Sequence, residues 1–240
     1  MTAPRRRKKQ YWFRWALLVV IVLLTIGSGW AAYLWYAVPA DYRQYERFLS
    51  TQTPERLDLA AAEVDKAVTD HRVVAGVQTV TLKRRQINAW LTRRLPRFLR
   101  DRGSEFPLKI HNVMVTFDDQ DFIFRGRFET TEYNKIVSVR VRIAFDQDGR
   151  MRLYLKSIHG GKLRLPLDVL TGLIRKNAET PEIQAAADQF EKLAEGQPID
   201  PRFAVDEDNA MVLISVETKG DQVTLRFRLE SRQPDSPGLP

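Results

Sequence analysis

Three histidines, His71, His111 and His159, are the side chains best suited to proton transfer near neutral pH. None stands in a recognisable motif with a serine or a carboxylate. The sequence also contains no G-x-x-x-x-G-K-[ST] phosphate loop, no G-x-S-x-G nucleophile elbow and no H-E-x-x-H zinc motif. It therefore predicts no catalytic residue and a protein that is not an enzyme. A hydrolase whose site is assembled from distant residues is the weakest functional hypothesis.

Two acidic clusters, at 118–121 and 146–149, contain the oxygen ligands that calcium prefers. A calcium loop needs about six such ligands, including a glutamate at its twelfth position. Counted from Asp146, that position is Ser157. Both clusters are more typical of hairpin turns, where Asp and Gly supply the backbone angles. The sequence therefore predicts turns at both places, and no metal or cofactor.

Arginines alternate with apolar residues in several predicted strands. In 136–145 (IVSVRVRIAF) the valines and Phe145 fall on one side and the arginines on the other, because successive strand side chains point to opposite faces. If Phe145 faces Met151 across the turn, Arg140 lies opposite Lys156, and Arg125 lies near Arg140. The predicted basic face comprises Arg125, Arg127, Arg140, Arg142, Arg152, Lys156, Arg226 and Arg228.

Two interpretations of this basic face stay open. Long cationic side chains keep a wet sheet face soluble and discourage pairing at its edge. Alternatively, the face binds an anionic partner, and outside a membrane that means lipid headgroups or an anionic envelope polymer. Arginine suits such partners because its planar guanidinium binds phosphate in a bidentate manner.

Apolar residues of a predicted helix and of three strands are expected to face one another. They form either a groove that wraps an acyl chain or a packed core. The candidate groove residues are Ile87, Trp90, Leu91, Phe98, Phe122, Phe124, Phe128, Val139 and Val141.

The elements that position these residues begin with a membrane span at 15–38. No residue from Trp15 to Ala40 is charged, and about 20 apolar residues suffice to cross a bilayer as a helix. Residues 1–14 contribute +6 of the net charge of +8, so the positive-inside rule places the N-terminus in the cytoplasm and the bulk of the chain outside. The apolar run is too long for a typical cleaved signal peptide.

The remainder is predicted to be one α+β domain at 76–231. Residues 41–75 form a helical stalk or a packed helix, and 232–240 a disordered tail. Period-two patterns after Pro107 indicate a curved antiparallel meander sheet, with amphipathic helices packed on one face. The chain has no cysteine, so this domain must be stabilised by its core alone.

Short motifs give the chain a resemblance to known proteins. They are Gln86-Ile87-Asn88 at the start of the amphipathic helix, Asp148-Gly149 in a hairpin, and GGKLRLP at 160–166. With the N-terminal span, this order resembles the YpmS-like membrane-anchored proteins of unknown function. It is also similar in general plan to tubular lipid-binding domains. The resemblance implies a non-enzymatic, envelope-facing domain that holds or passes an apolar ligand.

We therefore expect a single-pass, extracytoplasmic binding module for lipid or a lipid-like ligand in cell-envelope biogenesis. The alternative is a scaffold that recruits another envelope protein through its sheet edge or basic face. A nucleic-acid partner is not expected, because residues 15–240 carry a net charge of only +2 (8 − 6).

Overall fold

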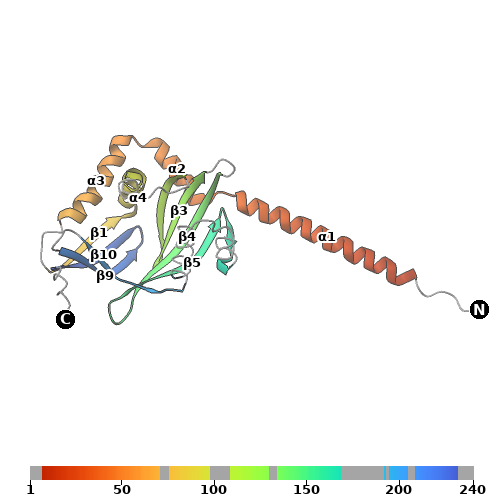
Figure 1. The fold of residues 1–240 in the computed structure, drawn as a ribbon. Helices are drawn as coiled ribbons and strands as arrows, with labels where there is room; N and C mark the ends of the chain where they lie inside the picture. Colours follow the sequence, from red (N-terminus) through yellow and green to blue (C-terminus); the bar gives the residue numbers. More distant parts are fainter. Residues whose placement is uncertain are drawn as a thin grey trace, which may run out of the picture.

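The computed structural model describes residues 7–70, 76–97, 109–129, 134–168, 192, 195–204 and 209–231. The protein is an α+β domain of antiparallel strands, from which one long helix projects (Figure 1). The tail predicted at 232–240 lies outside the described residues.

Helix α1 (Arg7–Tyr36) is the projecting element, and it is long and apolar enough to cross a membrane. Its 30 residues extend over about 45 Å, because each helical residue rises about 1.5 Å. Large apolar side chains along its described part are exposed, among them Leu23, Leu24 and Ile26 at 62–67%. Length and exposed apolar surface make α1 a candidate membrane span.

The end of α1 is fixed to the domain by two glycines. The backbone N–H of Lys162 donates a hydrogen bond to the Leu34 carbonyl oxygen at 2.8 Å. A Cβ added at Gly160 would lie 2.1 Å from the Trp35 ring, and one at Gly161 (φ +60°) 2.5 Å from the Trp35 carbonyl oxygen. Only glycine permits this close approach.

Strands predicted as one meander divide into two sheets. The large sheet has the order β2-β3-β4-β5-β6, with β7 paired to β5, and the small sheet has the order β1-β10-β9-β8. The large sheet contains β2 (Lys109–Asp118), β3 (Asp121–Glu129), β4 (Asn134–Phe145), β5 (Met151–Gly160), β6 (Leu163–Leu165) and β7 (Pro198–Ile199). The small sheet contains β1 (Val77–Lys83), β8 (Arg202–Ala204), β9 (Asn209–Lys219) and β10 (Gln222–Ser231).

The two acidic clusters form hairpin turns, as predicted. Asp118 pairs with Asp121 where β2 meets β3, and Asp119 takes a positive φ of 53°. At the β4–β5 turn the Asp146 carboxylate accepts a hydrogen bond from the Arg150 N–H at 2.9 Å, and Gly149 has φ +74°. A third hairpin, through Gly220, joins β9 and β10.

Helices α3 (Pro54–Asp70) and α4 (Arg84–Arg93) lie over one face of the strands (Figure 1). The main core forms beneath them, from Val64 on α3, Val115 and Phe122 of the large sheet, and Phe227 of the small sheet. The buried Asn88 of α4 accepts a hydrogen bond from the Val115 N–H at 2.6 Å and donates one to its carbonyl oxygen at 3.2 Å. This amide thus satisfies the outer backbone groups of an edge strand.

Helix α2 (Ala40–Thr51) packs on the opposite face of the large sheet, which corrects the prediction that helices cover one face only. Tyr42 is fully buried and Tyr45 is 7% exposed, in a second cluster with Met114 and Ile136. Burying two tyrosines contributes several kcal/mol, at about 1.5–3 kcal/mol for each large side chain. The sequence 41–51 is therefore a packed helix and not a free stalk.

Candidate functional site

The two faces of the large sheet carry the predicted site residues. We call the face with Arg125, Arg127, Arg140 and Arg142 the arginine face. The opposite one, with Phe122, Phe124, Val139 and Val141, is the apolar face. Strand register places these sets on opposite sides, since Phe122 pairs with Val141 and Phe124 with Val139, while Arg140 pairs with Ile123.

Carboxylates of the same chain pair with most of the predicted basic residues. The contacts are Arg125–Asp41 (2.7 Å), Arg127–Glu46 (2.6 Å), Arg140–Asp118 (2.5 Å), Arg140–Asp121 (3.3 Å), Arg142–Asp121 (2.6 Å), Arg152–Asp146 (3.3 Å) and Arg228–Glu230. Two of the acids, Asp41 and Glu46, come from α2, which follows α1. Sequence periodicity identified the arginines but not these partners, which lie far away in the chain.

Burial and charge both act on the α2 contact. Burial disfavours the charged form of Arg127 and so lowers its pKa. The hydrogen bond to Glu46 and the electrostatic effects of Glu46 and Tyr42 outweigh burial, so the pKa of Arg127 is raised overall. Burial and the Glu46 charge raise the pKa of Tyr42 well above its usual value, and burial raises that of Tyr45 to about 12. Both hydroxyls are therefore neutral donors at physiological pH, and the Tyr42 hydroxyl donates to the Asn112 carbonyl oxygen at 3.2 Å.

A bulge in β5 changes the predicted pairing of the basic residues. Phe145 does face Met151, but the register shifts between Arg140 and Val141, so that Arg140 pairs with Ser157 and not with Lys156. A bulge inserts an extra residue in one strand and alters the parity beyond it. Lys156 is exposed, with its Nζ 5.4 Å from the centre of the Tyr154 ring. Arg125 lies close enough to Arg140 that the second charge helps to lower its pKa, after burial itself.

One half of the apolar face is filled core. Phe122 is 8% exposed and stacks on Phe124 with ring centres 6.4 Å apart. Ile87, Trp90 and Leu91 of α4 pack against the same cluster. The Trp90 indole N–H donates to Asp65 of α3 at 2.8 Å, so this side chain ties two helices together. Phe98, also predicted to line a groove, lies outside the described residues.

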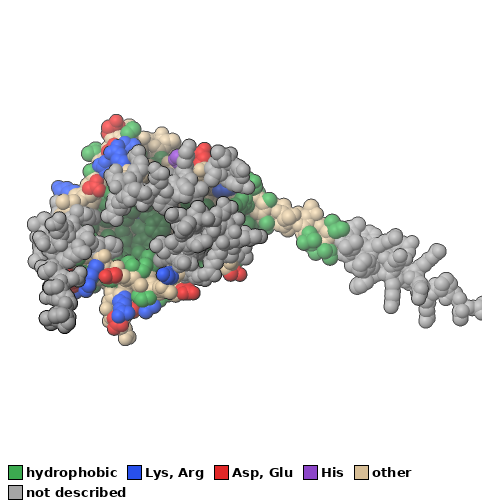
Figure 2. Space-filling model, in the orientation of Figure 1, with side chains coloured by type: hydrophobic (Ala, Val, Ile, Leu, Met, Phe, Trp, Pro, Cys, Tyr) green, Lys and Arg blue, Asp and Glu red, His purple; other side chains and the backbone are tan. Residues whose placement is uncertain are grey.

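In the other half of the apolar face, no described helix covers Phe124. Phe124 is 36% exposed although β3 is an inner strand of the large sheet. Phe128, Val139 and Val141 are half-buried beside it. Figure 2 shows hydrophobic side chains gathered in a hollow at the centre of the domain, between the two sheets seen in Figure 1.

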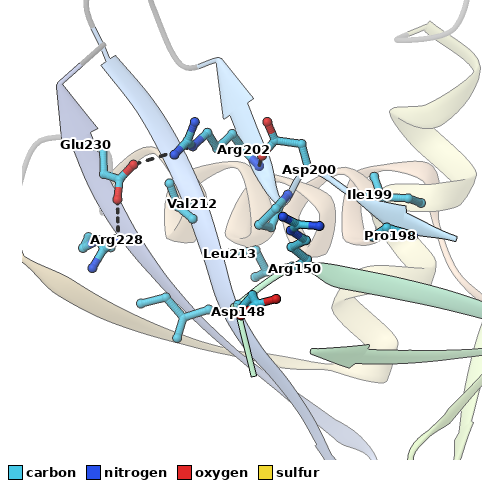
Figure 3. Close-up of a pocket in the computed structure, with 13 residues that line it drawn as sticks. Asp148, Arg150, Pro198, Ile199, Asp200, Arg202, Val212, Leu213, Arg228 and Glu230 are labelled. Carbon is cyan, nitrogen blue, oxygen red and sulfur yellow. Dashed lines mark hydrogen bonds and ion pairs between the residues drawn. The ribbon is translucent and has the colours of Figure 1, made fainter. Parts of the chain in front are cut away.

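A separate open pocket of about 620 Å³ lies where the β4–β5 turn meets β7, β8, β9 and β10 (Figure 3). Its described walls contain three arginines, Arg150, Arg202 and Arg228, and three acids, Asp148, Asp200 and Glu230. Glu230 contacts both Arg202, at 3.7 Å, and Arg228. Its charges are balanced, so the pocket shows no preference for a cation or an anion. Its walls come from distant strands, and no local motif marks it.

The histidines show no catalytic arrangement in the part of the chain that the structure describes. His111 lies 3.2 Å from Glu129, and both are about half exposed. His159 lies beside Ser138 and Arg140 in a small pocket on the arginine face. His71 lies outside the described residues. Within those described ranges, no three His, Asp or Glu side chains cluster as metal ligands would.

No model of a known protein family matches this chain, and no curated protein or solved structure matches it either. The relationship to YpmS-like proteins therefore stays a prediction.

Proposed function

We propose that this protein is a single-pass membrane protein whose extracytoplasmic domain binds lipid or a lipid-like apolar ligand on the open half of its apolar face. The observation that carries the proposal is the exposure of Phe124, at 36%, in the middle of an inner strand. Exposed apolar surface of this kind, set in a hollow, is typical of ligand sites.

The apolar face also leads toward the membrane helix. Val137 pairs with Gly160, where the Trp35 ring packs, and Val139 and Val141 follow along β4. Figure 1 shows β4 and β5 running away from the foot of α1 across the domain. An acyl chain that leaves the bilayer beside α1 would thus meet a continuous apolar path. This path suits a protein that takes lipid from, or returns it to, its own membrane in envelope biogenesis.

The scaffold hypothesis has less support. A protein that docks across the whole basic face would compete with carboxylates of this chain, because six of the eight predicted residues are already paired with them. Desolvating several of these ion pairs at once brings little net gain.

Photocrosslinking tests the ligand site. In the full chain, reconstituted in vesicles of phosphatidylcholine and phosphatidylglycerol, Phe124 is replaced by p-benzoylphenylalanine. We expect a lipid adduct at position 124 on irradiation, identified by mass spectrometry. The same photoreactive residue at Leu59, which is 68% exposed on α3, is the control for chance contact and should give no adduct. The absence of a lipid adduct at position 124 after irradiation would contradict the proposal.

The side of the membrane has its own test. Because the chain has no cysteine, Lys219→Cys at the tip of the β9–β10 hairpin introduces a single thiol. A membrane-impermeant maleimide should label it from outside once any outer envelope layer is permeabilised. Labelling only after lysis of the anchoring membrane would place the domain in the cytoplasm and remove the proposed topology.

A further inference from the structure

The small pocket on the arginine face lies at the foot of the membrane helix. It has a volume of about 260 Å³, below the roughly 300–1,000 Å³ of pockets for drug-sized molecules. Its walls come from β3, β4, β5, the segment after α1 and the β5–β6 turn. They consist of Pro39, Ile123, Arg125, Ser138, Arg140, His159, Gly161 and Lys162.

The charge of these walls is positive. Arg125, Arg140 and Lys162 are cations, and none of the described residues that line the pocket is a carboxylate. The acids that pair with its arginines are Asp41, at 2.7 Å from Arg125, and Asp118 and Asp121, at 2.5 and 3.3 Å from Arg140, and none of them is among the wall residues. A small anion therefore meets cations without facing a like charge from the walls.

Two residues that line this pocket, Arg125 and Ser138, each have a buried polar atom without a hydrogen-bond partner among the described residues. Ser138 is 5% exposed, and its hydroxyl is unpaired in the described part of the chain; the Nε of Arg125, whose side chain is 13% exposed, is likewise unpaired there. Unpaired buried donors are rare in native proteins, because each loses its hydrogen bonds to water without replacement. An acceptor within the pocket would satisfy both groups.

His159 also lines this pocket. Burial, and then the charges of Arg164, Arg140 and Arg125, lower the pKa of its imidazole. An anion in the pocket would offset these cations and raise that pKa again, which makes His159 a reporter of occupancy.

From this arrangement we infer that the pocket binds a phosphate-type oxyanion, held by Arg125, Arg140, Lys162 and the Ser138 hydroxyl. Arginine binds such groups through charge-assisted hydrogen bonds. The position at the foot of α1, near the exposed aromatic residues Trp30, Tyr33 and Tyr36, is the level at which lipid headgroups lie. The inference goes beyond the proposed function, because the pocket and the open apolar hollow are on opposite faces of the large sheet.

The test follows the imidazole signals of the full chain by NMR as the pH is varied. The His159 signal is assigned by its loss in His159→Gln. One arm uses the protein in dodecyl maltoside, which contains no phosphate, with added inorganic phosphate or chloride of equal ionic strength. The other arm uses phosphate-free buffer and nanodiscs of phosphatidylcholine with phosphatidylglycerol. We expect the pKa of His159 to rise, with saturation, in at least one arm.

The two arms separate the sources of the anion. A rise with inorganic phosphate in detergent shows that the free ion suffices, and a rise in nanodiscs alone assigns the site to a lipid headgroup. An unchanged pKa in both arms overturns the inference. The lipid adduct at Phe124 is read out separately, so either proposal can fail without the other.

Ser138→Ala is the decisive variant, because it removes the unpaired hydroxyl without adding bulk. We expect binding to weaken about tenfold, the usual effect of losing one hydrogen bond to a charged group, with the circular dichroism spectrum unchanged. Arg226→Gln removes a cation from the small sheet and should leave the binding as it is. A Ser138→Ala protein that binds as well as the original chain would show that the hydroxyl is not part of the site.

Discussion

The two faces of the large sheet differ in how well their side chains are covered, and the difference is the reverse of what their residue types suggest. The arginine face is covered by α2, and its cations are paired with Asp41, Glu46, Asp118 and Asp121. The described helices cover one half of the apolar face, and Phe124 stays 36% exposed on the other. Outside the small pocket around Ser138, the arginine face is therefore the more completely satisfied, and the exposed Phe124 leaves the apolar face with unused binding capacity.

This difference shows that the covering element, and not the residue type of the face, decides what a sheet surface does. An arginine covered by a helix that supplies a carboxylate is a structural contact. A phenylalanine without such a cover is a candidate ligand contact. The predictions below test this contrast in order of decreasing effect.

The largest effect should come from the filled half of the apolar face. Phe122→Ala should lower the free energy of unfolding by about 3–5 kcal/mol, because it leaves a cavity in the core. Phe124→Ala, two residues along on the same face, should cost only about 1–2 kcal/mol, because it opens no enclosed cavity. Urea unfolding of the full chain in detergent measures both. Equal costs would mean that the hollow is closed over Phe124.

The second-largest effect on stability should come from the contact between α2 and the arginine face. Asp41→Asn should lower the free energy of unfolding by about 1–2 kcal/mol, since Arg125 is 13% exposed and loses its counter-charge, although solvent at the 42% exposed Asp41 screens part of this. Asp148→Asn, at an exposed turn position, removes the same charge as a control. Equal urea midpoints for Asp41→Asn and Asp148→Asn would contradict a stabilising role for the Asp41–Arg125 ion pair.

A smaller effect is expected from His159 as the pH falls. Its pKa in the folded protein lies below the ordinary 6.5, so the unfolded chain binds the proton first. This residue should therefore contribute nothing to the pH dependence well above 6.5 and should destabilise the fold as the pH drops from about 6.5 toward the folded pKa. Arg125, Arg140, Lys162 and Arg164 surround it.

His159→Gln isolates this contribution from that of the carboxylates. The melting temperature of the original chain should fall more steeply than that of the variant between about pH 6.5 and 5 in phosphate-free detergent. Parallel curves would show that the imidazole titrates normally.

The smallest effect on stability should come from an exposed basic residue of the small sheet. Arg226 is exposed on the small sheet, and Arg226→Gln should change the free energy of unfolding by no more than about 0.5 kcal/mol. The same urea titration measures it. A loss as large as that of Asp41→Asn would show that the small sheet has a charged contact of its own.

The local features of the fold were predictable. Alternation placed Phe122 and Phe124 on one side of β3 and Arg125 and Arg127 on the other, and the Asp- and Gly-containing turns were expected where they occur. The division into two sheets was not, because strand patterns do not reveal which strands pair. The bulge opposite Arg140 was also missed, since a single inserted residue leaves the hydrophobic pattern almost unchanged.

The sequence predicted which types of residue the candidate sites contain, but not which of them meet in space. Trp90 was expected either to line a groove or to pack in the core, and its indole donates to Asp65 while the residue packs against the core cluster. The pocket around Ser138 and His159 had no signal in the sequence, because its walls come from five separate segments.

The sequence by itself determined the long apolar helix, the antiparallel strands and the side of each strand that is apolar. These properties depend on neighbours within a few residues, through the 3.6-residue period of helices and the two-residue period of strands. Only the tertiary structure decided which face is covered, which arginines are neutralised and where a hollow and a cationic pocket are left. Those outcomes depend on contacts between distant residues, such as Asp41 with Arg125 and Trp35 with Gly160, that no local pattern encodes.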